Sequence, residues 1–129
     1  MNSPQNRLLI VDDNEMNRDM LARRLVRNGY FVEVVENAQQ LMERAKQNDL
    51  DLVLLDIEMP EMNGFEFAET IRADNNLSTM PIIALSSMVS PAAIERGRIA
   101  GFHDYVAKFD RPGLIAALKE QTAEISRAA

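Results

Sequence analysis

The stretch Leu8-Leu9-Ile10-Val11-Asp12-Asp13 begins with four apolar residues and ends with two carboxylates. A continuous apolar run of this length, bounded by polar residues, predicts a β-strand that is buried on both faces. Similar runs rich in apolar residues follow at Tyr30–Val35, Leu52–Leu55 and Ile82–Leu85, and a shorter one spans Tyr105–Ala107. The repetition predicts five buried strands.

Amphipathic stretches separate these runs and predict helices. The first shows apolar residues at helical spacing, namely Met16, Met20, Leu21 and Leu25. Comparable patterns predict four more helices, around Leu41–Ala45, Phe65–Ile71, Pro91–Ala100 and Leu114–Ile125. Most of the eight methionines fall at helix or core spacing, which favours a packing role for them.

Five strand–helix pairs in strict alternation are typical of an α/β protein with a parallel sheet covered by helices on both faces. We therefore predict a single doubly wound, five-stranded parallel sheet with five helices. A chain of 129 residues has the usual size of one domain. The domain is expected to span residues 1–129, with its core at about 7–125.

Composition excludes several classes of function. Fourteen basic and twenty acidic residues leave a net charge of −6, which argues against nucleic acid as a partner of this chain by itself. Without cysteine, there is neither a zinc–thiolate site nor thiol catalysis. No apolar run is long enough to cross a bilayer, and the polar segment Met1–Gln5 lacks the apolar core of a signal peptide. The cytoplasm is the expected location.

Five polar residues, each just beyond an apolar run, are the candidates for chemistry: Asp12, Asp13, Asp56, Ser86 and Lys108. The carboxyl ends of parallel strands lie along one edge of a sheet, where such folds bind ligands. Three carboxylates brought together repel one another unless a cation neutralises them. Because every available ligand is a hard oxygen, Mg²⁺ is the predicted ion, and Mn²⁺ is able to replace it.

A metal held by carboxylates beside a lysine is a common arrangement for handling a phosphoryl group. An aspartate such as Asp56 can itself accept that group, while Ser86 and Lys108 contact its oxygens. Each residue alone is as well explained by a turn, a helix cap or an exposed side chain. Their joint placement favours a phosphoryl site, and neither a P-loop nor a dinucleotide-binding glycine motif offers an alternative.

The segments Leu9–Glu15, Leu55–Gly64 and Ala84–Ser87, followed by Lys108, resemble the receiver domain of two-component response regulators. The resemblance covers nearly the whole chain and implies the flavodoxin-like receiver fold. It also implies that Asp56 accepts a phosphoryl group from a phosphohistidine of a histidine kinase or a histidine phosphotransfer domain. Phosphorylation would then alter a surface that binds a downstream target.

The resemblance assigns roles to the other acidic residues. Asp12 and Asp13 match the acidic pair that binds Mg²⁺ together with Asp56, and the backbone carbonyl of Glu58 matches a further metal ligand. Ser86 matches the switch hydroxyl. Tyr105 lies at the position of the switch aromatic residue, although an aromatic side chain that merely covers the last helix explains it equally well.

One departure from the family concerns Phe109, which stands where proline usually follows the lysine. A cis peptide bond to a residue other than proline costs about 2.5–4 kcal/mol. We therefore predict a trans bond between Lys108 and Phe109, with the Lys108 ammonium still directed toward Asp56. The segment Asp104–Arg111 is similar to receiver domains at the C-terminus of chemotaxis-type hybrid histidine kinases. Both a free-standing receiver and one excised from a longer protein fit the sequence.

The resemblance implies a receiver that is not an enzyme for separate substrates, and the sequence leaves two alternative functions. The first is a Mg²⁺-dependent phosphatase or phosphotransferase that uses Asp56 as nucleophile on small phosphate esters. Glu58 has the spacing of the second carboxylate that such enzymes need, but strand alternation predicts that its side chain points elsewhere. The second is a docking module that is never phosphorylated, which the intact acidic set disfavours.

Overall fold

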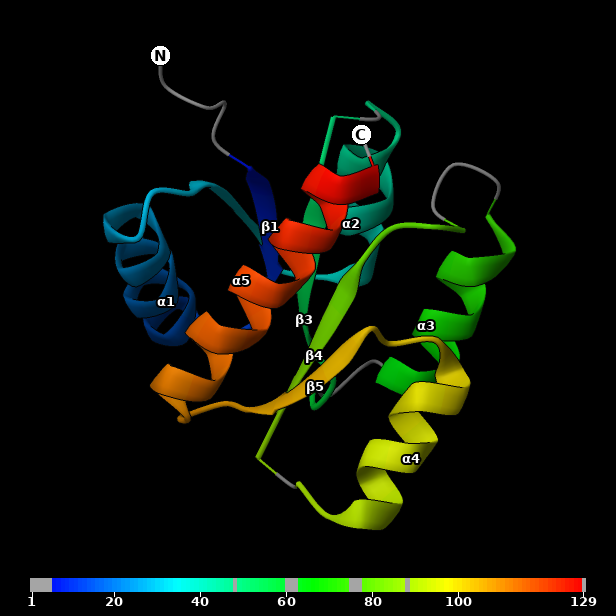
Figure 1. The fold of residues 1–129 in the computed structure, drawn as a ribbon. Coiled ribbons are helices and arrows are strands. Elements are labelled where there is room, and N and C mark those ends of the chain that lie inside the picture. Colours follow the sequence, from blue (N-terminus) through cyan, green and yellow to red (C-terminus); the bar gives the residue numbers. More distant parts are fainter. Residues whose placement is uncertain (1–5, 48, 60–62, 75–77, 88, 129) are drawn as a thin grey trace.

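Five parallel strands form one sheet in the order β2-β1-β3-β4-β5 (Figure 1). The computed structural model describes residues 6–47, 49–59, 63–74, 78–87 and 89–128. The strands are β1 (Arg7–Val11), β2 (Phe31–Val35), β3 (Leu52–Asp56), β4 (Ile82–Ser86) and β5 (Asp104–Ala107). The helices are α1 (Glu15–Arg27), α2 (Ala38–Ala45), α3 (Gly64–Ala73), α4 (Pro91–Ala100) and α5 (Arg111–Ala128). Strands and helices alternate along the chain, which confirms the predicted doubly wound fold.

The sheet lies between two helical layers, each with its own apolar core. On one face, Leu25 of α1 and Leu118 of α5 pack against strand residues such as Ile10. On the other face, α2, α3 and α4 cover the sheet, with Leu41 and Ile71 among the buried side chains. Because β1, β3 and β4 lie in the interior of the sheet, their apolar residues are buried on both faces, as predicted.

Strand β2 differs from the prediction of a fully buried strand. Phe31 and Val34 are exposed, and no residue of β2 is fully buried. The strand lies at the edge of the sheet and pairs only with β1. Residues at an edge have fewer neighbours from the helical layers, so an apolar sequence there does not imply burial.

Side-chain caps define where α1 and α4 begin, after the carboxyl ends of β1 and β4. The Asn14 side chain caps α1 by accepting a hydrogen bond from the Asn17 N–H at 2.9 Å. Only three residues separate the end of β1 from the start of this helix. Ser90 caps α4 in the same way, with Pro91 at the first helical position. Gly101 ends α4 with a φ of 108°, a left-handed conformation that glycine adopts without a steric penalty.

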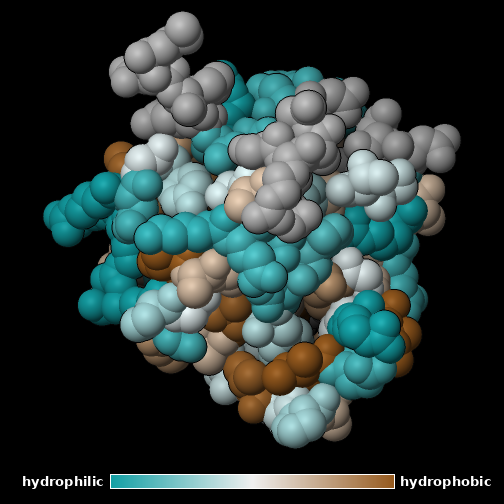
Figure 2. Space-filling model, viewed as in Figure 1, coloured by the Kyte–Doolittle hydropathy of each residue, from teal (hydrophilic) through white to brown (hydrophobic). Residues whose placement is uncertain are grey.

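Two methionines of α1 contradict the prediction that methionine packs in the core. Met16 is 71% exposed and Met20 is 49% exposed, whereas Leu25 on the same helix is buried. Helical spacing placed them on one stripe with Leu25, but the structure leaves both methionine side chains exposed. In Figure 2 the visible face is mostly hydrophilic, with hydrophobic residues gathered in the lower part of the view.

Within the described part of the chain, no helix is long and apolar enough to cross a membrane. The N-terminal segment Met1–Gln5 lies outside the described residues, and so do residues 60–62 of the motif that follows Asp56.

Candidate functional site

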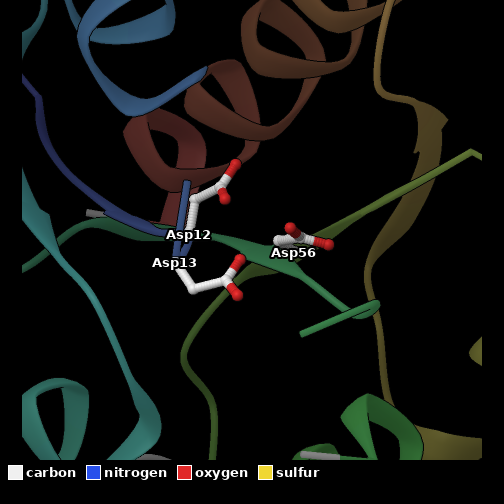
Figure 3. A group of neighbouring side chains, drawn as sticks. All are labelled: Asp12, Asp13 and Asp56. Atoms are coloured by element: carbon white, nitrogen blue, oxygen red, sulfur yellow. The ribbon is translucent and has the colours of Figure 1, made fainter. Parts of the chain in front are cut away.

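Three carboxylates meet at the carboxyl edge of the sheet. Asp12 and Asp13 follow β1, and Asp56 is the last residue of β3, the strand that pairs with β1 (Figure 3). One carboxylate oxygen from each of the three lies within 4.8 Å of the others. Asp12 and Asp56 are buried, whereas Asp13 is exposed. The adjacency of β1 and β3 thus brings together the three carboxylates that the sequence predicts.

Two contacts hold Asp12 in place. The Asn14 N–H donates to Asp12 Oδ1 at 2.9 Å, and the Arg18 guanidinium donates to the Asp12 carbonyl oxygen at 2.9 Å. Arg18 is buried and was missed in the sequence analysis. Its position was informative, because Arg18 lies three and seven residues before Leu21 and Leu25 and therefore on the apolar side of α1.

The electrostatics of the site favour a bound cation. Burial, followed by the neighbouring charge of Asp56, raises the pKa of Asp12 to about 6, although the Asn14 N–H opposes the shift. Three carboxylates within 4.8 Å of one another offer only hard oxygen donors. This donor set fits Mg²⁺, which keeps several water ligands and takes few protein oxygens.

Lys108 reaches the acidic group from the loop after β5. Its Nζ lies 3.1 Å from Asp56 Oδ1 and 3.1 Å from Glu58 Oε1. Partial burial opposes the charge of Lys108, but the hydrogen bonds to Glu58 and Asp56 outweigh it and raise the pKa of the ammonium. The described residues contain no cis peptide bond, so the bond to Phe109 is trans. Both parts of the prediction for this lysine are confirmed.

The Glu58 side chain lies in the site, and the prediction that it points elsewhere is wrong. Its oxygens accept from Ser87 N at 2.8 Å and from Ser87 Oγ at 2.6 Å. Strand alternation does not apply to Glu58, because β3 ends at Asp56 and the chain turns. The Glu58 N–H donates back to Asp56 Oδ1 at 2.9 Å, a two-residue turn that brings the carboxylate toward β4.

Ser86 and Ser87 extend the site to β4. Ser86 is buried, and its hydroxyl donates to Glu58 Oε2 at 3.3 Å. Partial burial opposes ionisation of Glu58, but the Ser87 hydrogen bonds and the Lys108 ammonium lower its pKa to about 2. Ser87 was missed as a contact residue, since a second serine after a strand carries no signal of its own.

Tyr105 is half-buried on β5, with its side chain packed against the core formed with α2, α3 and α4. A Cβ atom at Gly97 of α4 would lie 2.8 Å from the Tyr105 ring. The absence of a side chain at Gly97 therefore makes room for the ring in this position. The Tyr105 ring thus contacts α4, and Tyr105 also lines a cavity together with Gly113 and Ala117 of α5, so both interpretations of this residue remain open.

The geometry is that of an α/β domain with a buried carboxylate, two neighbouring acids and a lysine at the carboxyl edge of the sheet. The family model for the response regulator receiver domain matches residues 8–119. The chain belongs to this family, whose members accept a phosphoryl group and act as switches rather than as enzymes for separate substrates.

Individual relatives agree with this assignment. The chain is 34% identical over 122 residues to the sensory/regulatory protein RpfC of Xanthomonas campestris, covering 93% of this chain and 16% of RpfC. The structure is similar to the chemotaxis response regulator CheY4 of Vibrio cholerae, with a TM-score of 0.83, 28% identity, and coverage of 92% and 99% of the two chains. Another similar structure is a complex of histidine kinase ThkA with response regulator TrrA, with a TM-score of 0.79, 30% identity, and coverage of 91% and 98%. The chain spans about a sixth of the length of RpfC.

Proposed function

We propose that Asp56 is the phosphoryl acceptor of this receiver domain. A carboxylate oxygen of Asp56 attacks the phosphorus of a phosphohistidine, the P–N bond breaks, and the imidazole leaves and takes up a proton. Attack of water on phosphorus later releases inorganic phosphate and restores the carboxylate. The observation that carries the proposal is the pairing of the buried Asp56 with Lys108 at 3.1 Å, beside two further acids. Phosphotransfer to Asp56 and hydrolysis there are the only catalysis proposed.

The remaining residues of the site would bind the metal ion and the phosphoryl group. The carboxylates of Asp12, Asp13 and Asp56, with the backbone carbonyl of Glu58, would hold Mg²⁺, for which Mn²⁺ substitutes. When bound, the ion neutralises negative charge that develops on the phosphoryl oxygens. Lys108 supplies a second positive charge beside Asp56.

The surroundings of the site favour a protein as the phosphodonor. A cavity of about 80 Å³ lies between α1 and the loop after β5, and its lining joins Asp12 and Lys108 to the apolar side chains of Met20 and Phe109. Phe109 is 76% exposed, and Met16 is exposed on the first turn of α1. An apolar rim of this kind suits contact with a histidine kinase or a histidine phosphotransfer domain better than a small phosphate ester.

We further propose that phosphorylation draws Ser86 toward the phosphoryl group and alters the position of Tyr105. The Ser86 hydroxyl would donate to a phosphoryl oxygen, and the surface of α4, β5 and α5 would change with Tyr105. Amide hydrogen exchange measured before and after phosphorylation tests this relay, and changes confined to the Asp56 loop would contradict it.

The downstream target is not identified. A domain spanning 1–129 and a cytoplasmic location remain predictions.

Acetyl phosphate with Mg²⁺ tests the acceptor. Intact-protein mass should show one added phosphoryl group, and borohydride reduction should convert residue 56 to homoserine. Asp56→Asn should remove the adduct, whereas Asp19→Asn, which changes an exposed aspartate on α1, should keep it. Undiminished labelling of the Asp56→Asn variant would refute the assignment.

The phosphatase alternative gains one observation, because the Glu58 carboxylate does lie beside Asp56. Its oxygens, however, accept hydrogen bonds from Ser87 and face the Lys108 ammonium, which suits an ionised acceptor and not an acid that protonates a leaving group. Turnover of many equivalents of p-nitrophenyl phosphate would favour the enzyme, and a single stable adduct would favour the receiver.

A further inference from the structure

The Glu58 carboxylate is bound by an unusually complete set of donors. Ser87 donates to it through its N–H at 2.8 Å and its hydroxyl at 2.6 Å, and Ser86 donates through its hydroxyl at 3.3 Å. Lys108 Nζ lies 3.1 Å from the same carboxylate. An ammonium, a backbone N–H and two hydroxyls also suit the oxygens of a phosphoryl group.

These donors also surround the proposed acceptor. Lys108 Nζ lies 3.1 Å from Asp56 Oδ1 and from Glu58 Oε1, so one ammonium joins the two carboxylates. A phosphoryl group on Asp56 would bring its own negative charge to Lys108 and Ser86. Two anions that need the same donors exclude each other, because the one displaced loses hydrogen bonds and meets a like charge.

We propose that the Glu58 carboxylate is an internal competitor of the phosphoryl group and limits phosphorylation of Asp56. The proposal rests on the proposed function and deepens it: Glu58 is a positioning residue that holds Lys108, Ser86 and Ser87 in the unphosphorylated arrangement. The side chain must leave before the phosphoryl group binds. With 29% of its surface exposed and three rotatable bonds, it can turn toward solvent without movement of the backbone at Asp56.

The competition predicts a specific effect of neutralising Glu58. Glu58→Gln keeps the size of the side chain and its backbone carbonyl but removes the charge that attracts Lys108. Charge-assisted hydrogen bonds are about twice as strong as neutral ones. We expect the rate of phosphorylation by subsaturating acetyl phosphate with Mg²⁺ to rise about five- to tenfold, an effect of the size that loss of one such contact produces.

The matched control is Glu15→Gln, which removes one negative charge from an exposed residue at the start of α1. If Glu58 acted only through the net charge near the site, both variants would accelerate phosphorylation equally, and the proposal would be wrong. A slower reaction in Glu58→Gln would also overturn it, since Glu58 would then assist the transfer. Absence of any adduct on wild-type Asp56 would overturn the proposed function and this inference with it.

A binding measurement separates competition from a merely structural role. Beryllium fluoride with Mg²⁺ takes the shape of a phosphoryl group on a carboxylate, without covalent transfer from a donor. Titration followed by the Ser87 amide resonance should show an apparent affinity about tenfold higher in Glu58→Gln than in wild type or Glu15→Gln. Equal affinities in the three proteins would refute the proposal, even if the rates of phosphorylation differed.

Discussion

Two ionic clusters of this domain use similar residues in different ways. The acidic site consists of Asp12, Asp13, Asp56, Glu58 and Lys108; it holds four carboxylates and one ammonium, which pairs with Asp56 and Glu58. The arginine cluster consists of Arg7, Glu33, Arg44 and Asp49, in which two cations meet two carboxylates. The first carries excess negative charge, part of it buried, and the second is balanced and lies nearer the surface.

The pKa directions in the two clusters express this difference. In the arginine cluster, the hydrogen bonds to Asp49 and Glu33 raise the pKa of Arg44, and the pKa of Asp49 is lowered, so each partner stabilises the charge of the other. In the acidic site, burial and the charge of Asp56 raise the pKa of Asp12 to about 6. In the arginine cluster the opposite charges stabilise one another in the folded protein. The excess negative charge of the acidic site would be stabilised by binding a cation.

The largest expected effect is the removal of the ammonium from the acidic site. Lys108→Met leaves the neighbouring carboxylates without this positive partner, and we expect the unfolding free energy at pH 7 without Mg²⁺ to fall by about 2–3 kcal/mol. Arg7→Met in the arginine cluster should cost less than about 1 kcal/mol, because its ion pair with Asp49 is largely exposed. Urea denaturation measures both, and equal losses would remove the distinction between the clusters.

Neutralising Asp12 should stabilise the metal-free domain. The folded pKa of about 6 lies above the ordinary value of 3.8, so the unfolded chain binds fewer protons between these values, and the contribution of Asp12 to stability is lost as pH rises through that range. Asp12→Asn should therefore gain about 1–2 kcal/mol at pH 7 in EDTA and almost nothing near pH 4. Denaturation curves across this range test the sign, and a gain that grows toward acid would contradict it.

Mg²⁺ should stabilise the domain by binding at the acidic site. At ten times the dissociation constant the expected gain is about 1.4 kcal/mol, seen as a rise in melting temperature. The rise should vanish when Asp12 and Asp13 are both replaced by Ala and persist in Glu33→Gln, which alters only the arginine cluster. Retention of the rise in the double variant would place the ion elsewhere.

The smallest effect belongs to the arginine cluster itself. Glu33→Gln removes one partner of Arg44 but leaves Asp49, so the unfolding free energy should fall by less than about 1 kcal/mol. The loss should diminish further in high salt, which screens exposed charges. Urea denaturation at low and high NaCl compares the two conditions, and a larger, salt-independent loss would show that this cluster, too, is strongly coupled to the core.

Much of the site was predictable because the end of each apolar run in the sequence indicates where a strand ends. Asp12, Asp56, Ser86 and Lys108 each follow an apolar run, and parallel strands bring their carboxyl ends to one edge. The spacing of these residues was sufficient to recognise the receiver family. The trans bond after Lys108 was likewise predictable, because Phe109 is not a proline and a cis bond to any other residue costs several kcal/mol.

Patterns along the chain failed where a neighbour from another element decided the outcome. Glu58 turns toward Ser87 and Lys108 because the chain leaves β3 at Asp56, and neither partner is near it in sequence. Met16 and Met20 share the stripe of α1 with the buried Leu25, yet both are exposed, and spacing along the helix does not reveal this difference.

By itself, the sequence determined the order of strands and helices, the residues at the carboxyl edge and the family, because these depend on local periodicity and on spacing. Only the tertiary structure decided that β2 is an exposed edge strand, that Arg18 supports Asp12, and that Glu58 shares Lys108 with Asp56. Those features depend on which surfaces meet after folding. The charges of distant segments acquire their partners and their pKa values at that point.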